Sequence, residues 1–418
     1  MKKVLIYSML LIAGLVGSQL LPSTLGPSYD ALMPWIQALT MVALSYIMIG
    51  VGREFEIDKS NLKQYGWDYV VGATAAAFPW IFCCLYFVYV ILPPEAWTSW
   101  PAWKETLLAS RFAAPTSAGV LFSMLAAAGL AATWVFKKAR ILAIFDDLDT
   151  ILLMIPLKMA MVGMKWQLGV VVIFMAIMLW IAYKWLHQLR IPSGWKMTLL
   201  YSIVMVGIVT QIHSVSLRLD PTVPIHIEVL LPAFVLGCVM KLPDRKLDKN
   251  GDAILDHEEH AHERVGTIVS ACFMLLVGLS MPSVVESLRG GATPVDGEAA
   301  KEGAGLIKHA LSTMTPAMGW GTIALHVLAV TALANLGKMF PALCYRREAT
   351  LRERLAVAIG MWPRGEVGAG VLVISLSYGI GGPIVVIAML SLALNLVMTG
   401  VFILIVKKLL AGVPNPVR

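Results

Sequence analysis

Twelve apolar stretches, most of them close to 20 residues long, recur along this chain of 418 residues and constrain its fold more than any other feature. A helix that spans the hydrocarbon core of a bilayer needs about 20 mainly apolar residues. Only 14% of the residues are charged, whereas soluble domains carry about 25%. The sequence therefore predicts an all-α integral membrane protein with about 12, or 13, transmembrane helices. The stretches are residues 4–20, 31–52, 67–92, 105–128, 139–163, 166–186, 196–216, 226–241, 265–286, 317–343, 353–378 and 383–406.

Basic residues mark every second linker between these stretches. If the N-terminus is cytoplasmic and the spans alternate, 23 of the 33 lysines and arginines fall on the cytoplasmic side and six on the outer side. Cytoplasmic loops of multi-pass proteins carry this excess. Both termini are therefore predicted to be cytoplasmic, and residues 4–20 to remain as the first span. The net charge of +7 is an orientation signal and does not indicate a nucleic-acid partner.

A faint repeat relates the two halves of the chain. Ile-Gly-Val-Gly at 49–52 resembles Leu-Val-Gly-Leu at 276–279, and the interruption Ala-Pro-Thr-Ser at 114–117 corresponds to Pro-Arg-Gly-Glu at 363–366. Both matches are seven spans apart, and an odd offset reverses direction in the membrane. The repeats are therefore predicted to be inverted, as in many secondary transporters, whose sites lie where interrupted helices meet.

This pattern predicts one membrane transporter domain, residues 1–418, with three parts. The first inverted repeat covers 1–163, linking helices cover 164–216, and the second inverted repeat covers 226–406.

Three aspartates lie within four residues of the fifth stretch, at Asp146, Asp147 and Asp149. A charged residue at the bilayer centre costs about 2.5–3.5 kcal/mol on insertion scales, so such residues generally have a function. Burial and mutual repulsion favour a proton on a carboxylate pair, whereas a bound monovalent cation favours the ionised form. Cation and proton would compete for the same oxygens, and this competition indicates coupled exchange.

Other polar residues lie in or near the interrupted stretches. Lys338 is expected to pair with one of the aspartates, although it could instead extend to the cytoplasmic interface. Pro115 breaks its helix at membrane depth, where freed backbone groups must line a cavity or be covered by protein. Thr116 and Ser117 then offer oxygens to a small cation.

The second interruption adds Arg364 and Glu366, which either pair with each other or compensate the half-helix dipoles. Asn395 follows Pro363 at about the interval that separates Asp146 from Pro115, and it is expected to be a supporting polar group. Arg111, just before the first interruption, is expected to reach the interface or to pair with Glu105.

One charged linker is a weak candidate for metal binding. It spaces oxygen-bearing side chains as an EF-hand loop does, but Ala253 replaces the turn glycine. Metal binding or pH sensing competes here with a solvated loop. The candidate ligands are Asp248, Asn250, Asp252, His257, His260 and His262.

Taken in order, four motifs resemble the bacterial monovalent cation:proton antiporter-2 family, which includes dimeric Na⁺/H⁺ antiporters. They are Ala-Pro-Thr-Ser-Ala-Gly at 114–119, Asp146-Asp147, Lys338, and Gly-Met-Trp-Pro-Arg-Gly-Glu-Val at 360–367. The resemblance implies a homodimer in which a core domain with two crossed, interrupted helices moves like an elevator. It also implies that Asp147 carries the ion and the proton, that Asp146 pairs with Lys338, and that exchange is electrogenic.

The chain also departs from that family, because Asp149 adds a third acid and Trp362 replaces a smaller residue. The predicted function is antiport of Na⁺ or Li⁺ against H⁺ across a cell inner membrane, without enzyme activity or cofactor. The alternatives are K⁺/H⁺ exchange or another proton-coupled substrate on the same fold, a channel, and a membrane-embedded metalloenzyme that uses the His/Glu loop at 257–263.

Overall fold

The computed structural model of the chain describes residues 2–53, 55, 62–162, 166–219, 227, 229–241, 257–281, 318–377, 380 and 382–411. Every regular element in this part of the chain is a helix, and one isolated bridge joins Leu189 to Met240. The predicted all-α class is therefore confirmed.

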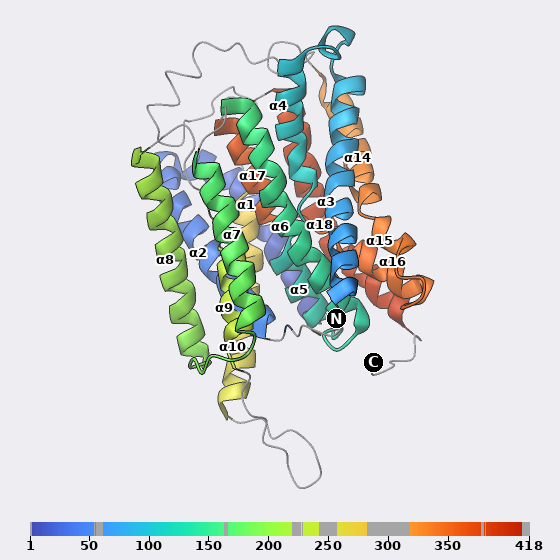
Figure 1. Cartoon of the computed structure of the whole chain (residues 1–418). Coiled ribbons are helices and arrows are strands. Elements are labelled where there is room, and N and C mark those ends of the chain that lie inside the picture. Colours follow the sequence, from blue (N-terminus) through green and yellow to red (C-terminus); the bar gives the residue numbers. More distant parts are fainter. Residues whose placement is uncertain are drawn as a thin grey trace. The chain divides into compact units, whose positions relative to one another are not determined.

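The helices follow the predicted stretches closely (Figure 1). They are α1 (Lys2–Leu25), α2 (Pro27–Arg53), α3 (Leu62–Tyr86) with a π-helical turn (Phe87–Ile91), a 3₁₀ turn (Pro94–Ala96), α4 (Trp100–Ser110), a 3₁₀ turn (Arg111–Ala113), α5 (Ala118–Ala127), α6 (Trp134–Val162), α7 (Trp166–Lys184), α8 (Trp195–Leu219), α9 (Leu230–Val239), α10 (His257–Leu279), α14 (Trp320–Gly337), α15 (Phe340–Leu343), α16 (Leu351–Gly360), α17 (Glu366–Ser377) and α18 (Pro383–Leu410).

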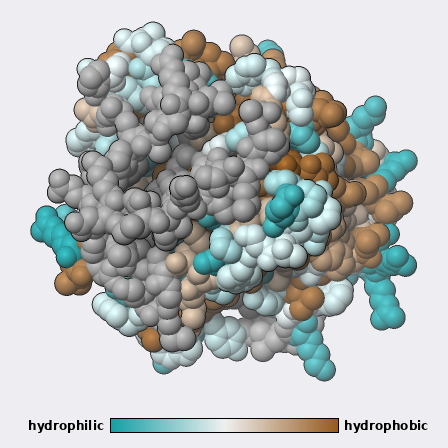
Figure 2. Space-filling view, turned by 90° about the horizontal axis from the view of Figure 1, so that it is seen from above, coloured by the Kyte–Doolittle hydropathy of each residue, from teal (hydrophilic) through white to brown (hydrophobic). Residues whose placement is uncertain are grey.

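Within the described residues, seven helices are long and apolar enough to cross a bilayer unaided: α1, α2, α3, α7, α8, α14 with α15, and α18. Large apolar side chains are exposed on several of them, including Trp35, Ile173 and Leu325, each more than 60% exposed. On the face shown in Figure 2, hydrophobic side chains lie along the outer edge. Such surfaces require a lipid environment. The total of about 12 spans stays a prediction.

The chain forms two compact units. Unit 1 comprises residues 1–30, 60–163 and 277–418, and its helices are α1, α3 to α6 and α14 to α18. Its core is built by α14 packing against α3 and α18, and by α6 packing against α3 and α16. Gly337 permits the close approach of α14 to α3, because a Cβ there would lie 2.5 Å from the backbone nitrogen of Pro79.

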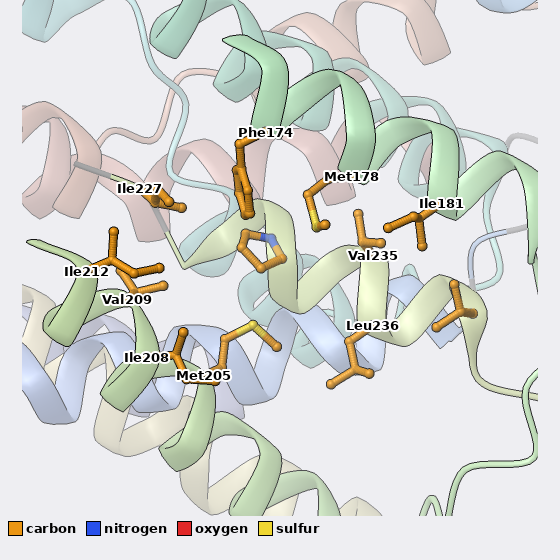
Figure 3. Close-up of a pocket in the computed structure, with 12 residues that line it drawn as sticks. Phe174, Met178, Ile181, Met205, Ile208, Val209, Ile212, Ile227, Val235 and Leu236 are labelled. Atoms are coloured by element: carbon orange, nitrogen blue, oxygen red, sulfur yellow. The ribbon is translucent and has the colours of Figure 1, made fainter. Parts of the chain in front are cut away.

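Unit 2 comprises residues 31–59 and 164–276, with most of α2 and α10 and all of α7, α8 and α9. Gly52 of α2 and Gly237 of α9 lie so close to the opposite backbone that neither position has room for a side chain. An apolar pocket of about 310 Å³ lies among α7, α8 and α9, lined by residues such as Phe174, Met205 and Val235 (Figure 3). Its lining includes no charged side chain, so it offers no ligand to a cation.

Candidate ion-binding site

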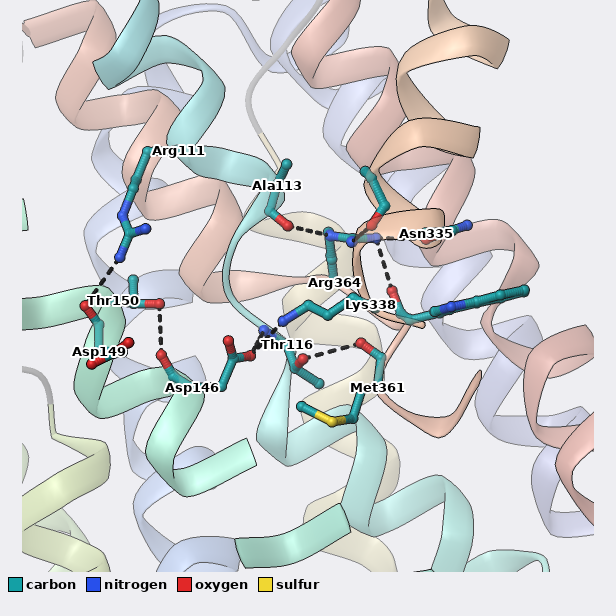
Figure 4. A network of polar contacts seen from close by, with 12 residues as sticks. Arg111, Ala113, Thr116, Asp146, Asp149, Thr150, Asn335, Lys338, Met361 and Arg364 are labelled. Atoms are coloured by element: carbon teal, nitrogen blue, oxygen red, sulfur yellow. Dashed lines mark hydrogen bonds and ion pairs between the residues drawn. The ribbon is translucent and has the colours of Figure 1, made fainter. Parts of the chain in front are cut away.

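Two interruptions of helices meet inside unit 1. The first break, residues 114–117, lies between the 3₁₀ turn Arg111–Ala113 and α5, and the second break, residues 361–365, lies between α16 and α17. The N–H of Ser117 donates to the carbonyl of Pro363 at 2.9 Å, and the Thr116 hydroxyl donates to the carbonyl of Met361 at 3.0 Å. The backbone groups freed by each break are thus partly satisfied by the other break (Figure 4).

Asp146 of α6 lies beside this crossing and is fully buried. Its Oδ2 accepts hydrogen bonds from Lys338 Nζ at 2.8 Å and from the N–H of Thr116 at 2.7 Å. In the described structure its Oδ1 has no hydrogen-bond partner. Lys338, at the C-terminal end of α14, is also fully buried, so it forms an ion pair and does not extend to an interface.

Asp147, the next residue of α6, is 3% exposed. The Thr150 hydroxyl donates to the main-chain carbonyl of Asp146 at 2.9 Å, and α6 continues past the acidic residues to Val162. Asp146 and Lys338 therefore lie together at the crossing of the two breaks, and Asp147 is the next buried residue of α6.

Asp149 lies one turn beyond Asp146 and has different partners. Its Oδ1 accepts from the Tyr69 hydroxyl of α3 at 2.9 Å. Its main-chain carbonyl accepts from Arg111 at 3.1 Å. Arg111 is fully buried and does not reach an interface.

Arg364, in the second break, is fully buried, and among the described residues its hydrogen bonds go to neutral acceptors. Its Nε donates to the carbonyl of Ala113 at 2.8 Å, which fastens the second break to the first. Its terminal nitrogens donate to the Asn335 side chain at 2.7 Å and to the Trp362 and Ala334 carbonyls. Glu366 begins α17, but its side chain lies outside the described residues, so the predicted pair with Arg364 is not tested.

Asn395 of α18 is fully buried, and neither atom of its amide has a hydrogen-bond partner in the part of the chain that the structure describes. The Thr399 hydroxyl donates to its main-chain carbonyl at 3.0 Å. Within the described residues, the Asn395 side chain therefore makes no hydrogen bond to either break. Its predicted supporting role stays a prediction.

The side chains of the candidate metal ligands lie outside the described part of the structure. Residues Asp248, Asn250 and Asp252 lie outside the described chain, and His257, His260 and His262 lie on α10 with side chains that are not described. Among the described residues, no group of three or more histidines, cysteines, aspartates or glutamates could hold a metal ion.

Sequence reasoning missed a second buried lysine–aspartate pair in unit 1, here called the Asp68 cluster: Gln64, Asp68, Lys138, Tyr345 and Glu348. Lys138 Nζ contacts both oxygens of Asp68, at 3.0 and 3.1 Å, and Glu348 at 3.2 Å. The Tyr345 hydroxyl donates to Asp68 at 2.7 Å, and Gln64 donates to Glu348 at 3.0 Å. The only signal in the sequence was an acid at the edge of an apolar stretch.

An all-helical membrane fold with two crossed helix breaks around buried charges defines a secondary ion transporter. Residues 3–380 match the family model described as sodium/hydrogen exchanger, transmembrane, and the chain belongs to that family. It is therefore a multi-pass membrane protein for cation/proton antiport, as predicted, and its family and fold are those of transporters rather than enzymes.

Among solved structures, the chain is similar to the sodium proton antiporter MjNhaP1 from Methanocaldococcus jannaschii, with a TM-score of 0.54 and 16% sequence identity. The match covers 94% of this chain and 91% of the other. At this identity the similarity supports the fold alone. No curated protein matches the chain.

Proposed function

We propose that the protein exchanges Na⁺ or Li⁺ for protons electrogenically, with Asp146 and Asp147 as the ion-binding and proton-binding groups. One observation carries this proposal. Asp146 is fully buried next to Asp147, yet among the described residues only one of its oxygens has hydrogen-bond donors, Lys338 and the N–H of Thr116. A buried carboxylate oxygen without a donor is costly unless a proton or cation binds there.

Charge balance supports exchange over simple binding. The buried acids Asp146, Asp147 and Asp149 of α6 are offset by buried bases, Arg111, Lys338 and Arg364. A cation that enters this set adds a charge to a medium of low dielectric constant, which is unfavourable unless a positive charge leaves. Arginine cannot give up its proton in a protein, whereas a buried lysine or a protonated carboxylic acid can.

The roles of the remaining residues follow from this scheme. Asp147 is the principal carrier, and Asp146 alternates between Lys338 and the transported ion. Thr116 and Ser117 supply oxygens at the first break, while Arg364 holds the two breaks together. Glu366 and Asn395 are supporting polar groups.

The paired aspartates, rather than an Asn-Asp pair, favour the antiporter-2 branch and more protons than cations in each cycle. The two compact units suit an elevator, in which the unit that carries the ion site moves during transport. We further propose a homodimer in a bacterial-type inner membrane, with both termini cytoplasmic and a role in pH homeostasis. The inverted repeats 1–163 and 226–406, with linking helices 164–216, belong to the same proposal.

The test uses the full chain in proteoliposomes with a trapped pH dye and an imposed proton gradient. Addition of Na⁺ or Li⁺ should dissipate the gradient, faster when the membrane potential favours net proton movement. Asp147→Asn should abolish the response, whereas Glu95→Gln, which neutralises an exposed carboxylate, should leave it unchanged.

Three outcomes would change the proposal. A response to K⁺ alone would replace it with K⁺/H⁺ exchange. An exchange rate that does not depend on the membrane potential would show that the exchange is electroneutral. Full activity of Asp147→Asn would remove that residue from the mechanism.

A further inference from the structure

Arg111 is a buried cation whose role the exchange scheme leaves open. Its side chain is fully buried, and its guanidinium carbon lies 4.6 Å from the ring centroid of Trp80. One terminal nitrogen donates to the main-chain carbonyl of Asp149. Its Nε and its other terminal nitrogen have no acceptor within the described structure. Hydrogen bonding alone therefore does not account for a charge at this position.

A permanently charged guanidinium in such surroundings requires an acid nearby. Asp146 and Asp149 lie one turn apart on α6, the helix that Arg111 contacts. Asp146 already pairs with Lys338 at 2.8 Å. Asp149 is the acid whose main-chain carbonyl Arg111 contacts directly, and its carboxylate accepts a hydrogen bond from the Tyr69 hydroxyl.

We infer that Arg111 and Asp149 form a fixed charge pair that positions the acid-bearing turn of α6 against the first break. Asp149 then keeps its negative charge throughout the cycle, because its protonation would leave Arg111 uncompensated. The third acid is a positioning residue and adds no proton to the exchange. This inference rests on the proposed exchange at Asp146 and Asp147, and it assigns the proton count to those two residues and Lys338.

Besides Asp149, a second buried carboxylate, that of Glu105, is a candidate partner of Arg111. Glu105 of α4 is 4% exposed and lies six residues before Arg111 in the sequence. The contact between Arg111 and the Asp149 backbone favours Asp149. Glu105 therefore provides a matched control, since it is also a buried acid near the same arginine in sequence.

The experiment compares Arg111→Met, Asp149→Asn and the double variant with Glu105→Gln and Glu105→Gln/Arg111→Met. Breaking a buried charge pair is costly, so each of the first two single variants should exchange Na⁺ about tenfold more slowly than the parent. The Arg111→Met/Asp149→Asn double variant should recover most of the rate, because no isolated charge remains. The double variant with Glu105→Gln should show no recovery.

The coupling ratio, measured from the reversal potential, distinguishes a positioning role of Asp149 from a role as a proton carrier. Asp149→Asn should leave the number of protons per cation unchanged. A lower proton number in this variant, or a failure of the double variant to recover, would overturn the inference. Asp149→Asn leaves Arg111 in place, so its coupling ratio still tests the inference if Arg111→Met does not fold.

Thermal unfolding of the same variants in detergent keeps this test separate from the proposed function. The midpoint temperature of unfolding should fall in Arg111→Met and in Asp149→Asn and recover in the variant that carries both substitutions. If the parent chain exchanges no cation, the proposed function fails, and the unfolding series still tests the charge pair. Additive losses of stability in the double variant would contradict the pairing.

Discussion

Two buried lysine–aspartate pairs in unit 1 differ in how completely their carboxylates are satisfied. In the Asp68 cluster, Lys138 reaches both oxygens of Asp68, a Tyr345 hydroxyl adds a third donor, and Lys138 Nζ also lies 4.4 Å from the centroid of the Tyr345 ring. Within the part of the chain that the structure describes, Asp146 has two donors on one oxygen and none on the other.

This difference separates a structural ion pair from an exchangeable one. A carboxylate with every oxygen engaged gains nothing from a further ligand, and such a network rigidifies its surroundings. A carboxylate with one oxygen unsatisfied, next to a second buried acid, gains from a proton or a cation. Both pairs are buried lysine–aspartate pairs, so burial alone would not have distinguished them.

The largest expected effect comes from removing the lysine at the exchangeable pair. Lys338→Met should lower the rate of Na⁺/H⁺ exchange about 100-fold or more, because the group that alternates with the transported ion is lost. The unfolding temperature should change less than for the corresponding lysine of the Asp68 cluster, since Asp146 keeps the Thr116 N–H and can bind a proton. Proteoliposome assays and thermal unfolding measure the two quantities. Undiminished exchange would show that both pairs are structural.

The corresponding substitution in the Asp68 cluster should mainly reduce stability. Lys138→Met leaves Asp68 buried with a single hydroxyl donor, and loss of one partner of a buried pair costs about 3–5 kcal/mol. Chemical denaturation should show this loss, while the fraction that remains folded should bind Na⁺ with the parent's affinity. Recovery of stability in Asp68→Asn/Lys138→Met would show that the loss comes from the unpaired charge of Asp68, as expected for a structural ion pair. A changed Na⁺ affinity without a loss of stability would contradict it.

The sequence predicts the helices and the two breaks well, because both depend on local features. Runs of apolar residues define spans such as α14, and Pro115 and Pro363 mark the interruptions. The residues alone predict an ion pair for Lys338, but they leave open which aspartate it contacts. That choice depends on packing between residues 192 positions apart in the chain.

Contacts made by ordinary residues were beyond sequence reasoning. Tyr345 reaches Asp68 across 277 positions, and neither residue belongs to a recognisable motif. Asn335, which accepts from Arg364, is one polar residue among many at the end of an apolar stretch. The packing of α3, α6 and the α15–α16 connection brings the first pair together, and the approach of α14 to the second break brings the other. A single sequence contains no direct record of that packing.

The smallest expected effect concerns the tyrosine that completes the Asp68 cluster. Tyr345→Phe removes one hydrogen bond to a charged acceptor and should cost about 1.5–3 kcal/mol at neutral pH. Burial, and then the negative charge of Asp68, raise the pKa of the Tyr345 phenol above its ordinary value of about 10. Below that pH the phenol is neutral in both the folded and the unfolded chain, so the stability that it contributes is fully present.

Above pH of about 10 the unfolded chain releases the Tyr345 proton while the folded chain retains it, so the contribution declines as the pH rises. The unfolding midpoints of the parent and of Tyr345→Phe should therefore differ by a constant amount up to about pH 10 and converge above it. Unfolding scans at closely spaced pH values would measure this. A gap that widens in alkali would mean that the phenol ionises more readily in the folded protein. The Asp68 cluster would then respond to pH in the folded protein, a behaviour that the comparison assigns to Asp146 and not to Asp68.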